Sequence, residues 1–126
     1  MGKEMRISDS ELEVMTALWD MEAPATMAEI LACLRSRGWE DSTVKTFVGR
    51  LVKKGALTQE KKGVYYYAPA VSRDEYGRSA VMRIKDRLYR GSVGLMLSSL
   101  VEEEHLTRQE IDELYEILKN AEEGET

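Results

Sequence analysis

Residues 41–57 read Asp-Ser-Thr-Val-Lys-Thr-Phe-Val-Gly-Arg-Leu-Val-Lys-Lys-Gly-Ala-Leu, and the rest of the chain is best understood from this stretch. Apolar residues recur in it at three- and four-residue spacing, which predicts a helix with one buried stripe. The stripe consists of Val44, Phe47, Val48, Leu51 and Val52. We expect Asp41 or Ser42 to cap the start of this helix and Gly55 to end it.

The opposite face of the predicted helix is polar and basic. It carries short hydroxyl side chains, a glycine and two cations, namely Ser42, Thr43, Lys45, Thr46, Gly49 and Arg50. In a DNA major groove, short polar groups reach base edges and long cations reach phosphates. An ordinary solvated face fits this helix equally well. The segments before and after the helix are therefore needed to distinguish a DNA-contacting face from a solvated one.

The segment before this helix predicts two further helices. Ser8 and Thr26 are each followed three residues later by a glutamate, which is the spacing of a capping box. We expect the first helix to end in a break at residues 21–25 and the second to run to about Arg37. A short turn then leads into the basic helix, which is helix-turn-helix organisation.

The segment after the basic helix predicts a β-hairpin. Residues 57–61 and 64–68 favour strands and are joined by a tight Lys-Gly turn. Tyr65 and Tyr67 share one face of their strand, so we expect both to pack against the domain. Two helices, a basic helix and a basic-tipped hairpin, in that order, predict a winged helix-turn-helix domain and favour DNA binding.

The distribution of charge is compatible with DNA binding. The 126-residue chain has a net charge of −5, but residues 35–62 carry eight cations and only three acids. Salt screens the acidic remainder from this basic segment. The predicted base-reading residues are Ser42, Thr43, Lys45 and Thr46, and the predicted phosphate-binding residues are Arg50, Lys53, Lys54, Lys61 and Lys62.

Composition argues against several other classes. The single cysteine and single histidine exclude an intramolecular disulfide and predict no metal site and no cofactor. No nucleophile–base pair or glycine-rich phosphate loop is recognisable, so we expect no enzyme. The apolar window at residues 93–101 is too short to cross a bilayer, and no signal peptide opens the chain, so we expect a cytoplasmic protein.

Residues 71–126 predict an all-helical lobe, distinct from a DNA-binding domain at residues 1–70, so we expect a mainly α fold. Three helices are expected, capped at Ser72 and Thr107 and interrupted at residues 91–94. So few residues bury too little surface alone, and a second copy of the chain is the simplest partner. The predicted dimerisation residues are Val81, Ile84, Leu88, Leu95, Leu97, Leu100, Ile111, Leu114 and Leu118.

Two alternatives remain open at this point. The C-terminal helices could fold back on the winged domain instead of forming a homodimer. The winged domain could also be a protein-interaction module whose basic face docks an acidic protein without sequence-specific DNA binding.

The sequence resembles the penicillinase and methicillin-resistance repressors and the related copper-transport repressors, the BlaI/MecI/CopY type. The similar blocks are Ile7-Ser8 through Glu13-Val14-Met15 to Leu18-Trp19-Asp20, Thr43-Val44-Lys45-Thr46, Arg50-Leu51-Val52-Lys53-Lys54-Gly55, the tyrosine-rich wing strand and Glu110-Ile111-Asp112-Glu113-Leu114. The likeness covers roughly residues 6–120.

This resemblance implies a homodimeric winged-helix repressor that occupies a palindromic double-stranded DNA operator. It implies base reading at positions 42, 43, 45 and 46, and phosphate contacts from Arg50 and the following lysines. For the β-lactam branch it also implies release by proteolysis, triggered by a membrane sensor, at the position of Ser99–Leu100.

The chain departs from both branches of the family it resembles. The β-lactam repressors carry Asn-Phe at the cleaved bond, whereas this chain carries Ser99-Leu100. The copper branch carries Cys-x-Cys pairs near its C-terminus, and residues 120–126 hold no cysteine here. We therefore expect no copper sensing by that route.

Overall fold

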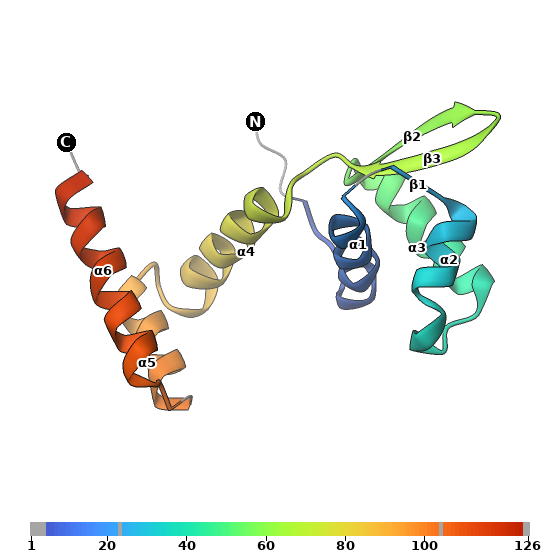
Figure 1. Cartoon of the computed structure of the whole chain (residues 1–126). Helices are drawn as coiled ribbons and strands as arrows, with labels where there is room; N and C mark the ends of the chain where they lie inside the picture. The colour runs from blue at the N-terminus through green and yellow to red at the C-terminus, as the bar shows by residue number, and fades with distance from the viewer. Residues whose placement is uncertain (1–4, 23, 104, 125–126) are drawn as a thin grey trace. The chain divides into compact units, whose positions relative to one another are not determined.

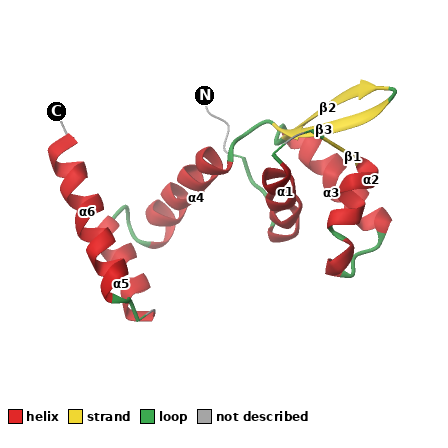
Figure 2. Ribbon diagram, in the orientation of Figure 1, coloured by secondary structure: helices red, strands yellow, loops and turns green. Residues whose placement is uncertain are grey.

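The computed structural model describes residues 5–22, 24–103 and 105–124, so Ala23 in the predicted break lies outside the described residues. Helices dominate, with one small sheet (Figures 1 and 2), which confirms the mainly α fold. The elements are α1 (Asp9–Met21), β1 (Ala25–Thr26), α2 (Met27–Cys33), a 3-10 turn η1 (Arg35–Arg37), α3 (Asp41–Lys54), β2 (Leu57–Lys62), β3 (Val64–Pro69), α4 (Arg73–Leu88), α5 (Val93–Glu103) and α6 (Arg108–Gly124).

Both predicted capping boxes of the N-terminal helices are confirmed. The Ser8 and Thr26 hydroxyls accept hydrogen bonds from the amides of Glu11 and Glu29, and the two carboxylates accept from the Ser8 and Thr26 amides in return. The second helix is shorter than predicted, because α2 gives way after Cys33 to the 3-10 turn η1.

The start of α3 differs from the prediction by one residue. Glu40 occupies the N-cap position in an extended conformation, and its carbonyl accepts from the amides of Thr43 and Val44. Asp41 and Ser42 therefore lie inside the helix, where the charge of Asp41 suits the positive end of the helix dipole. Gly55 ends the helix with φ of 88°, as predicted.

The predicted hairpin is confirmed, and a third strand joins it. β2 and β3 pair antiparallel around Gly63, whose φ of 77° suits the tight turn (Figure 2). The sheet order is β1-β3-β2, with Ala25 opposite Tyr67. Tyr67 is buried as predicted, but Tyr65 is 44% exposed, because it lies further out on the hairpin than β1 reaches.

The hydrophobic core of the N-terminal unit lies between α1, α2, α3 and the sheet. The predicted stripe of α3 supplies three of its members, Val44, Val48 and Leu51, which are almost fully buried. They pack in one cluster with Val14, Met15, Ala17, Leu18, Ala25, Ile30, Leu34, Ala56, Leu57 and Tyr67. Burial of this stripe turns the polar face of α3 outward.

The chain divides into two compact units between Ser79 and Ala80, inside α4, whereas the sequence suggested a boundary at residue 70. The start of α4 belongs to the N-terminal unit because residues 70–76 contact it. The Ala70 amide donates to the Ala56 carbonyl over 2.8 Å, and the Trp19 Nε1 donates to the Val71 carbonyl over 2.9 Å.

The first and last C-terminal helices begin at the predicted caps, but the interruption predicted at residues 91–94 lies at residues 89–92, so Val93 and Gly94 belong to α5. Ser72 and Thr107 form the expected capping boxes with Glu75 and Glu110. The interruption after α4 contains two residues with positive φ, Arg90 and Gly91. In the described ranges, no helix combines the length and apolarity needed to cross a membrane.

Candidate nucleic-acid interface

The exposed face of α3 carries the predicted base-reading side chains. Ser42, Lys45 and Thr46 are exposed and Thr43 is half-buried, so Thr43 lies at the edge of this face. Among the described residues, the side chains of Ser42 and Lys45 have no hydrogen-bond or ion-pair partner. Both can therefore be offered to a ligand without breaking an internal contact.

The hydroxyl of Thr46 is held in one orientation. Its Oγ1 donates to the Ser42 carbonyl over 3.0 Å, the common i−4 bond of helical threonines. The proton is thus engaged, while the oxygen can still accept. Thr46 is suited to accept a hydrogen bond from a base amino group rather than to donate one.

Gly49 lies on the same face, between the predicted base readers and Arg50. A Cβ added at Gly49 would meet no atom of the described chain within 4 Å. The glycine is therefore not required by packing inside the protein, although it weakens a helix by about 1 kcal/mol relative to alanine. It leaves the backbone of α3 without a covering side chain at this exposed position.

The predicted phosphate-binding cations come from two elements. Arg50 and Lys53 are exposed on α3, and neither has a partner in the part of the chain that the structure describes. Lys61 and Lys62 are exposed at the end of β2. The Lys61 ammonium lies 5.7 Å from the centre of the Tyr65 ring, and that of Lys62 lies 3.9 Å from the Glu60 carboxylate.

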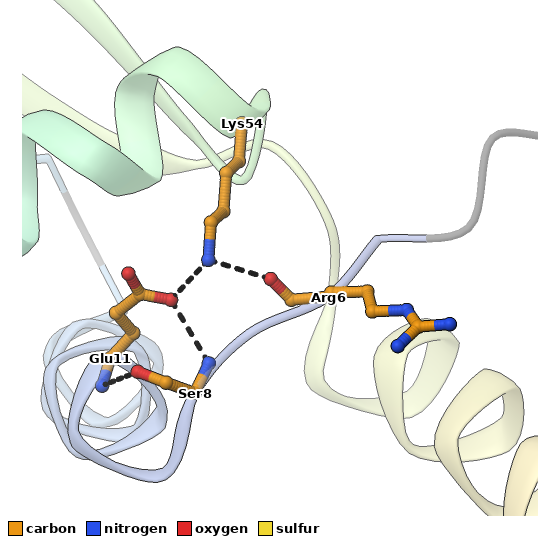
Figure 3. A network of polar contacts seen from close by, with 4 residues as sticks. All are labelled: Arg6, Ser8, Glu11 and Lys54. Carbon is orange, nitrogen blue, oxygen red and sulfur yellow. Dashed lines mark hydrogen bonds and ion pairs between the residues drawn. The ribbon is translucent and has the colours of Figure 1, made fainter.

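Lys54 differs from the other predicted cations because its ammonium is engaged inside the protein. It donates to the carboxylate of Glu11 and, over 2.7 Å, to the Arg6 carbonyl (Figure 3). Glu11 also accepts from the Ser8 amide over 2.9 Å. These contacts tie the last turn of α3 to the start of α1, so we assign Lys54 a structural role and remove it from the proposed phosphate-binding set.

The Glu11 carboxylate is only 2% exposed, yet it is stabilised in its charged form. Burial alone raises the pKa of this carboxyl. The hydrogen bonds from Lys54 and Ser8 and the charge of Lys54 outweigh burial, so the pKa of Glu11 lies below its ordinary value of 4.5. The Glu11 carboxylate therefore stays ionised near neutral pH.

Sequence reasoning identified Glu11 only as a capping residue. Its partner Lys54 lies 43 positions away, and no local spacing links the two residues. The contacts of Trp19 with residues after the sheet were missed for the same reason. Only a three-dimensional arrangement could have revealed either.

The predicted dimerisation residues form no closed core in the described chain. Most are exposed, with Leu88 the extreme at 71%, while Leu97, Ile111 and Leu114 are half-buried. The exposed members of the predicted set are Val81, Ile84, Leu88, Leu95, Leu100 and Leu118. Large apolar side chains left in water in this number are typical of an interface.

The Ser99–Leu100 bond lies inside α5, and Leu100 is 56% exposed. The Ser99 hydroxyl accepts a hydrogen bond from the Tyr89 hydroxyl over 3.2 Å. A protease that binds extended chains would have to unwind this helix before it could cut the bond.

Comparison with known proteins places the chain in one family over most of its length. The family model described as penicillinase repressor matches residues 7–120. The penicillinase repressor of Bacillus licheniformis is 35% identical over 120 residues, which are 94% of either chain. The methicillin resistance regulatory protein MecI of Mammaliicoccus sciuri is 30% identical over 119 residues, covering 93% of this chain and 96% of that protein.

Two solved structures resemble the N-terminal part of the chain. One is the DNA-binding domain of the repressor BlaI, with a TM-score of 0.53 and 37% identity over 60% of this chain and 94% of that one. The other is Bacillus licheniformis BlaI in monomeric form in complex with the blaP half-operator, with a TM-score of 0.52 and the same identity and coverage. The winged helix-turn-helix unit of the structure agrees with these likenesses, and the chain belongs to the penicillinase repressor family.

Proposed function

We propose that this protein is a transcriptional repressor that binds a palindromic DNA operator as a homodimer. The observation that carries the proposal is the exposed polar and basic face of α3, continued by the basic end of the hairpin, in a chain whose family consists of repressors. The structure of its relative BlaI has been solved in complex with a half-operator, and the N-terminal unit of this chain resembles that structure.

In this proposal, α3 lies in the major groove. Ser42, Lys45 and Thr46 contact base edges, with Thr43 at the margin of the contact. Arg50, Lys53, Lys61 and Lys62 contact phosphates, which position the protein and make its affinity depend on salt.

The C-terminal unit supplies the dimer. Its exposed apolar side chains on α4, α5 and α6 need a cover, and a second copy of the chain offers an identical surface. Pairing of two chains places two recognition helices on two half-sites about one helical turn apart. Half-sites related by two-fold symmetry follow from the symmetry of the protein.

Release of the operator would follow from damage to the dimer. Cleavage at Ser99–Leu100 would separate α6 and the end of α5 from the rest of the chain. Because this bond lies in a helix, cleavage by a sensor-controlled protease would require local unwinding of α5 first. Incubation of dimeric and monomeric protein with a non-specific protease, followed by mass spectrometry, would show whether this bond opens.

In vitro selection of random duplexes by the full-length protein, at roughly physiological salt, tests the main proposal. We expect recovery of a two-fold symmetric site with half-sites about one turn apart. Recovery of no consensus by a dimeric protein would contradict base reading and would favour a protein-interaction module instead.

A further inference from the structure

The segment between the sheet and α4 is bound to α1 rather than free. Five residues make this joint: Trp19 and Asp20 at the end of α1, and Val71, Arg73 and Tyr76 after the sheet. All five belong to the N-terminal unit, which extends to Ser79. We call these five residues the α1–α4 joint.

Trp19 is the centre of the joint. Its indole nitrogen donates to the Val71 carbonyl over 2.9 Å, which holds the chain just before α4 begins. Its ring lies 6.2 Å from the ring of Tyr76, which is only 9% exposed. The indole thus contacts both the backbone leading into α4 and the first turn of that helix.

Arg73 closes the joint from the solvent side. Its guanidinium lies over the Trp19 ring, 5.7 Å from the centre, and forms an ion pair with the Asp20 carboxylate. Ser72 caps α4 at the same point by binding Glu75. Consequently every residue from Ala70 to Arg73 has a hydrogen bond or an ion pair, and no free linker separates the sheet from α4.

A bound segment and a free segment have different consequences on DNA. Lengthening the spacer of a palindrome by one base pair rotates one half-site by about 34° and shifts it by about 3.4 Å. A free linker of three residues has a root-mean-square span of about 9–10 Å, which would absorb such a shift. A joint that fixes the first turn of α4 on the DNA-binding unit removes this freedom between the sheet and α4.

We propose that the α1–α4 joint sets the half-site spacing that the dimer accepts, with Trp19 and Arg73 as positioning residues. The inference rests on the proposed function, because spacing has meaning only for a dimer on a palindrome. It adds that specificity for the operator is determined partly by residues that lie on neither the DNA-contacting face of α3 nor the dimer surface.

The test uses the full-length double variant Trp19→Phe/Arg73→Ala. It keeps an aromatic ring at position 19 but removes the indole donor, the ion pair and the cation over the ring. Arg78→Ala is the matched control, because Arg78 is an exposed arginine on the same helix and lies outside the joint. Circular dichroism and thermal unfolding confirm that all three proteins fold.

Binding is measured on the selected operator, on spacers changed by one and two base pairs, and on a single half-site. We expect wild type and Arg78→Ala to lose about tenfold or more in affinity per base pair, as two-site binding is lost when geometry prevents both contacts. We expect the double variant to lose only about threefold, with half-site affinity within about twofold of wild type.

The outcomes separate this inference from the proposed function. If wild type selects no paired half-sites, the dimeric repressor and the role of the joint both fail. If wild type prefers one spacing and the double variant keeps the same spacing profile, only the role of the joint fails. A fall in half-site affinity equal to the fall on every operator would also overturn it, since the joint would then act on α3 itself.

Discussion

The two units of this chain bury their apolar residues to very different extents. Among its described residues, the N-terminal unit encloses a cluster of thirteen buried side chains between three helices and a sheet. In the described parts of α5 and α6 no residue is buried, and large apolar side chains are exposed instead. The first unit completes its core by itself, whereas the second requires another surface. This difference supports the proposal that the first unit binds DNA and that the second pairs with another copy of the chain.

Damage to the core of the N-terminal unit should give the largest loss of stability. Leu18 is fully buried on α1, so Leu18→Ala should lower the free energy of unfolding by about 3 kcal/mol. Denaturant unfolding of the full chain measures this loss, and binding to a half-site should weaken as the folded fraction falls. A loss below about 1 kcal/mol would mean that the core tolerates cavities and is not the stabilising feature described.

A charge added to the exposed apolar surface of the C-terminal unit should prevent dimerisation without unfolding the chain. Leu88→Glu places a carboxylate on the most exposed of the proposed dimer residues. We expect a monomer by sedimentation and a loss of about 10²-fold in operator affinity, with half-site affinity unchanged. Ser98→Glu, which adds the same charge at an exposed polar position, is the control. A dimer that survives Leu88→Glu would remove Leu88 from the interface.

Substitution of Glu11 tests how much the Glu11–Lys54 ion pair contributes to the stability of the N-terminal unit. Glu11→Gln should cost about 2 kcal/mol at pH 7, because it removes a charge-assisted hydrogen bond to Lys54. Folding lowers the pKa of Glu11, so its stabilisation is present above the ordinary value of 4.5 and is lost as pH falls through the folded value.

The difference in stability between wild type and Glu11→Gln should therefore shrink below about pH 4.5, which denaturant unfolding at several pH values would measure. The lowered pKa of Glu75, held by hydrogen bonds from Ser72, is common to both proteins and cancels. A difference that stays constant down to low pH would show that the carboxylate charge is not what stabilises the contact.

Substitution of Lys45 tests whether the N-terminal unit reads bases through α3. Lys45→Ala should cost about 1–3 kcal/mol on the best half-site and loosen preference at particular bases. Binding to a panel of single-base variants of the half-site measures both effects. Equal losses on specific and random duplexes would contradict base reading by Lys45.

Lys62 should give the smallest effect. Lys62→Ala is expected to weaken all sequences similarly and to reduce the slope of log affinity against log salt by about one. Lys54→Ala provides a contrast, since Lys54 is engaged by Glu11 and should change stability more than the salt slope. A salt slope that is unchanged in Lys62→Ala would place this lysine away from the phosphates.

Local patterns predicted the elements well, because caps and periodicity involve residues close in sequence. Four capping boxes, the stop at Gly55 and the hairpin turn at Gly63 were all recognisable. The strand Ala25–Thr26 was not, since two residues carry no periodicity and become a strand only by pairing with β3. The exposed Tyr65 was misassigned, because strand alternation gives a face but not how far the neighbouring layer extends.

The candidate site was likewise predictable where it depends on local pattern and not where it depends on contacts between distant residues. Exposure of the α3 face follows from its apolar stripe, so the positions of Ser42, Lys45 and Thr46 could be anticipated. The internal role of Lys54 could not, because it depends on a carboxylate 43 residues away. Charge alone does not distinguish a lysine that is available to bind phosphate from one that stabilises the fold.

Gly49 has a consequence for how such a protein can evolve. Replacing it with alanine would strengthen α3 by about 1 kcal/mol, and no atom of the described chain stands in the way. Thermostability is therefore available at this position without any repacking. If α3 lies in the major groove as proposed, the added methyl group would lie between this helix and the DNA. At this position the proposed function and the stability of the helix make opposite demands, so we expect a variant chosen for stability alone to bind its operator less tightly.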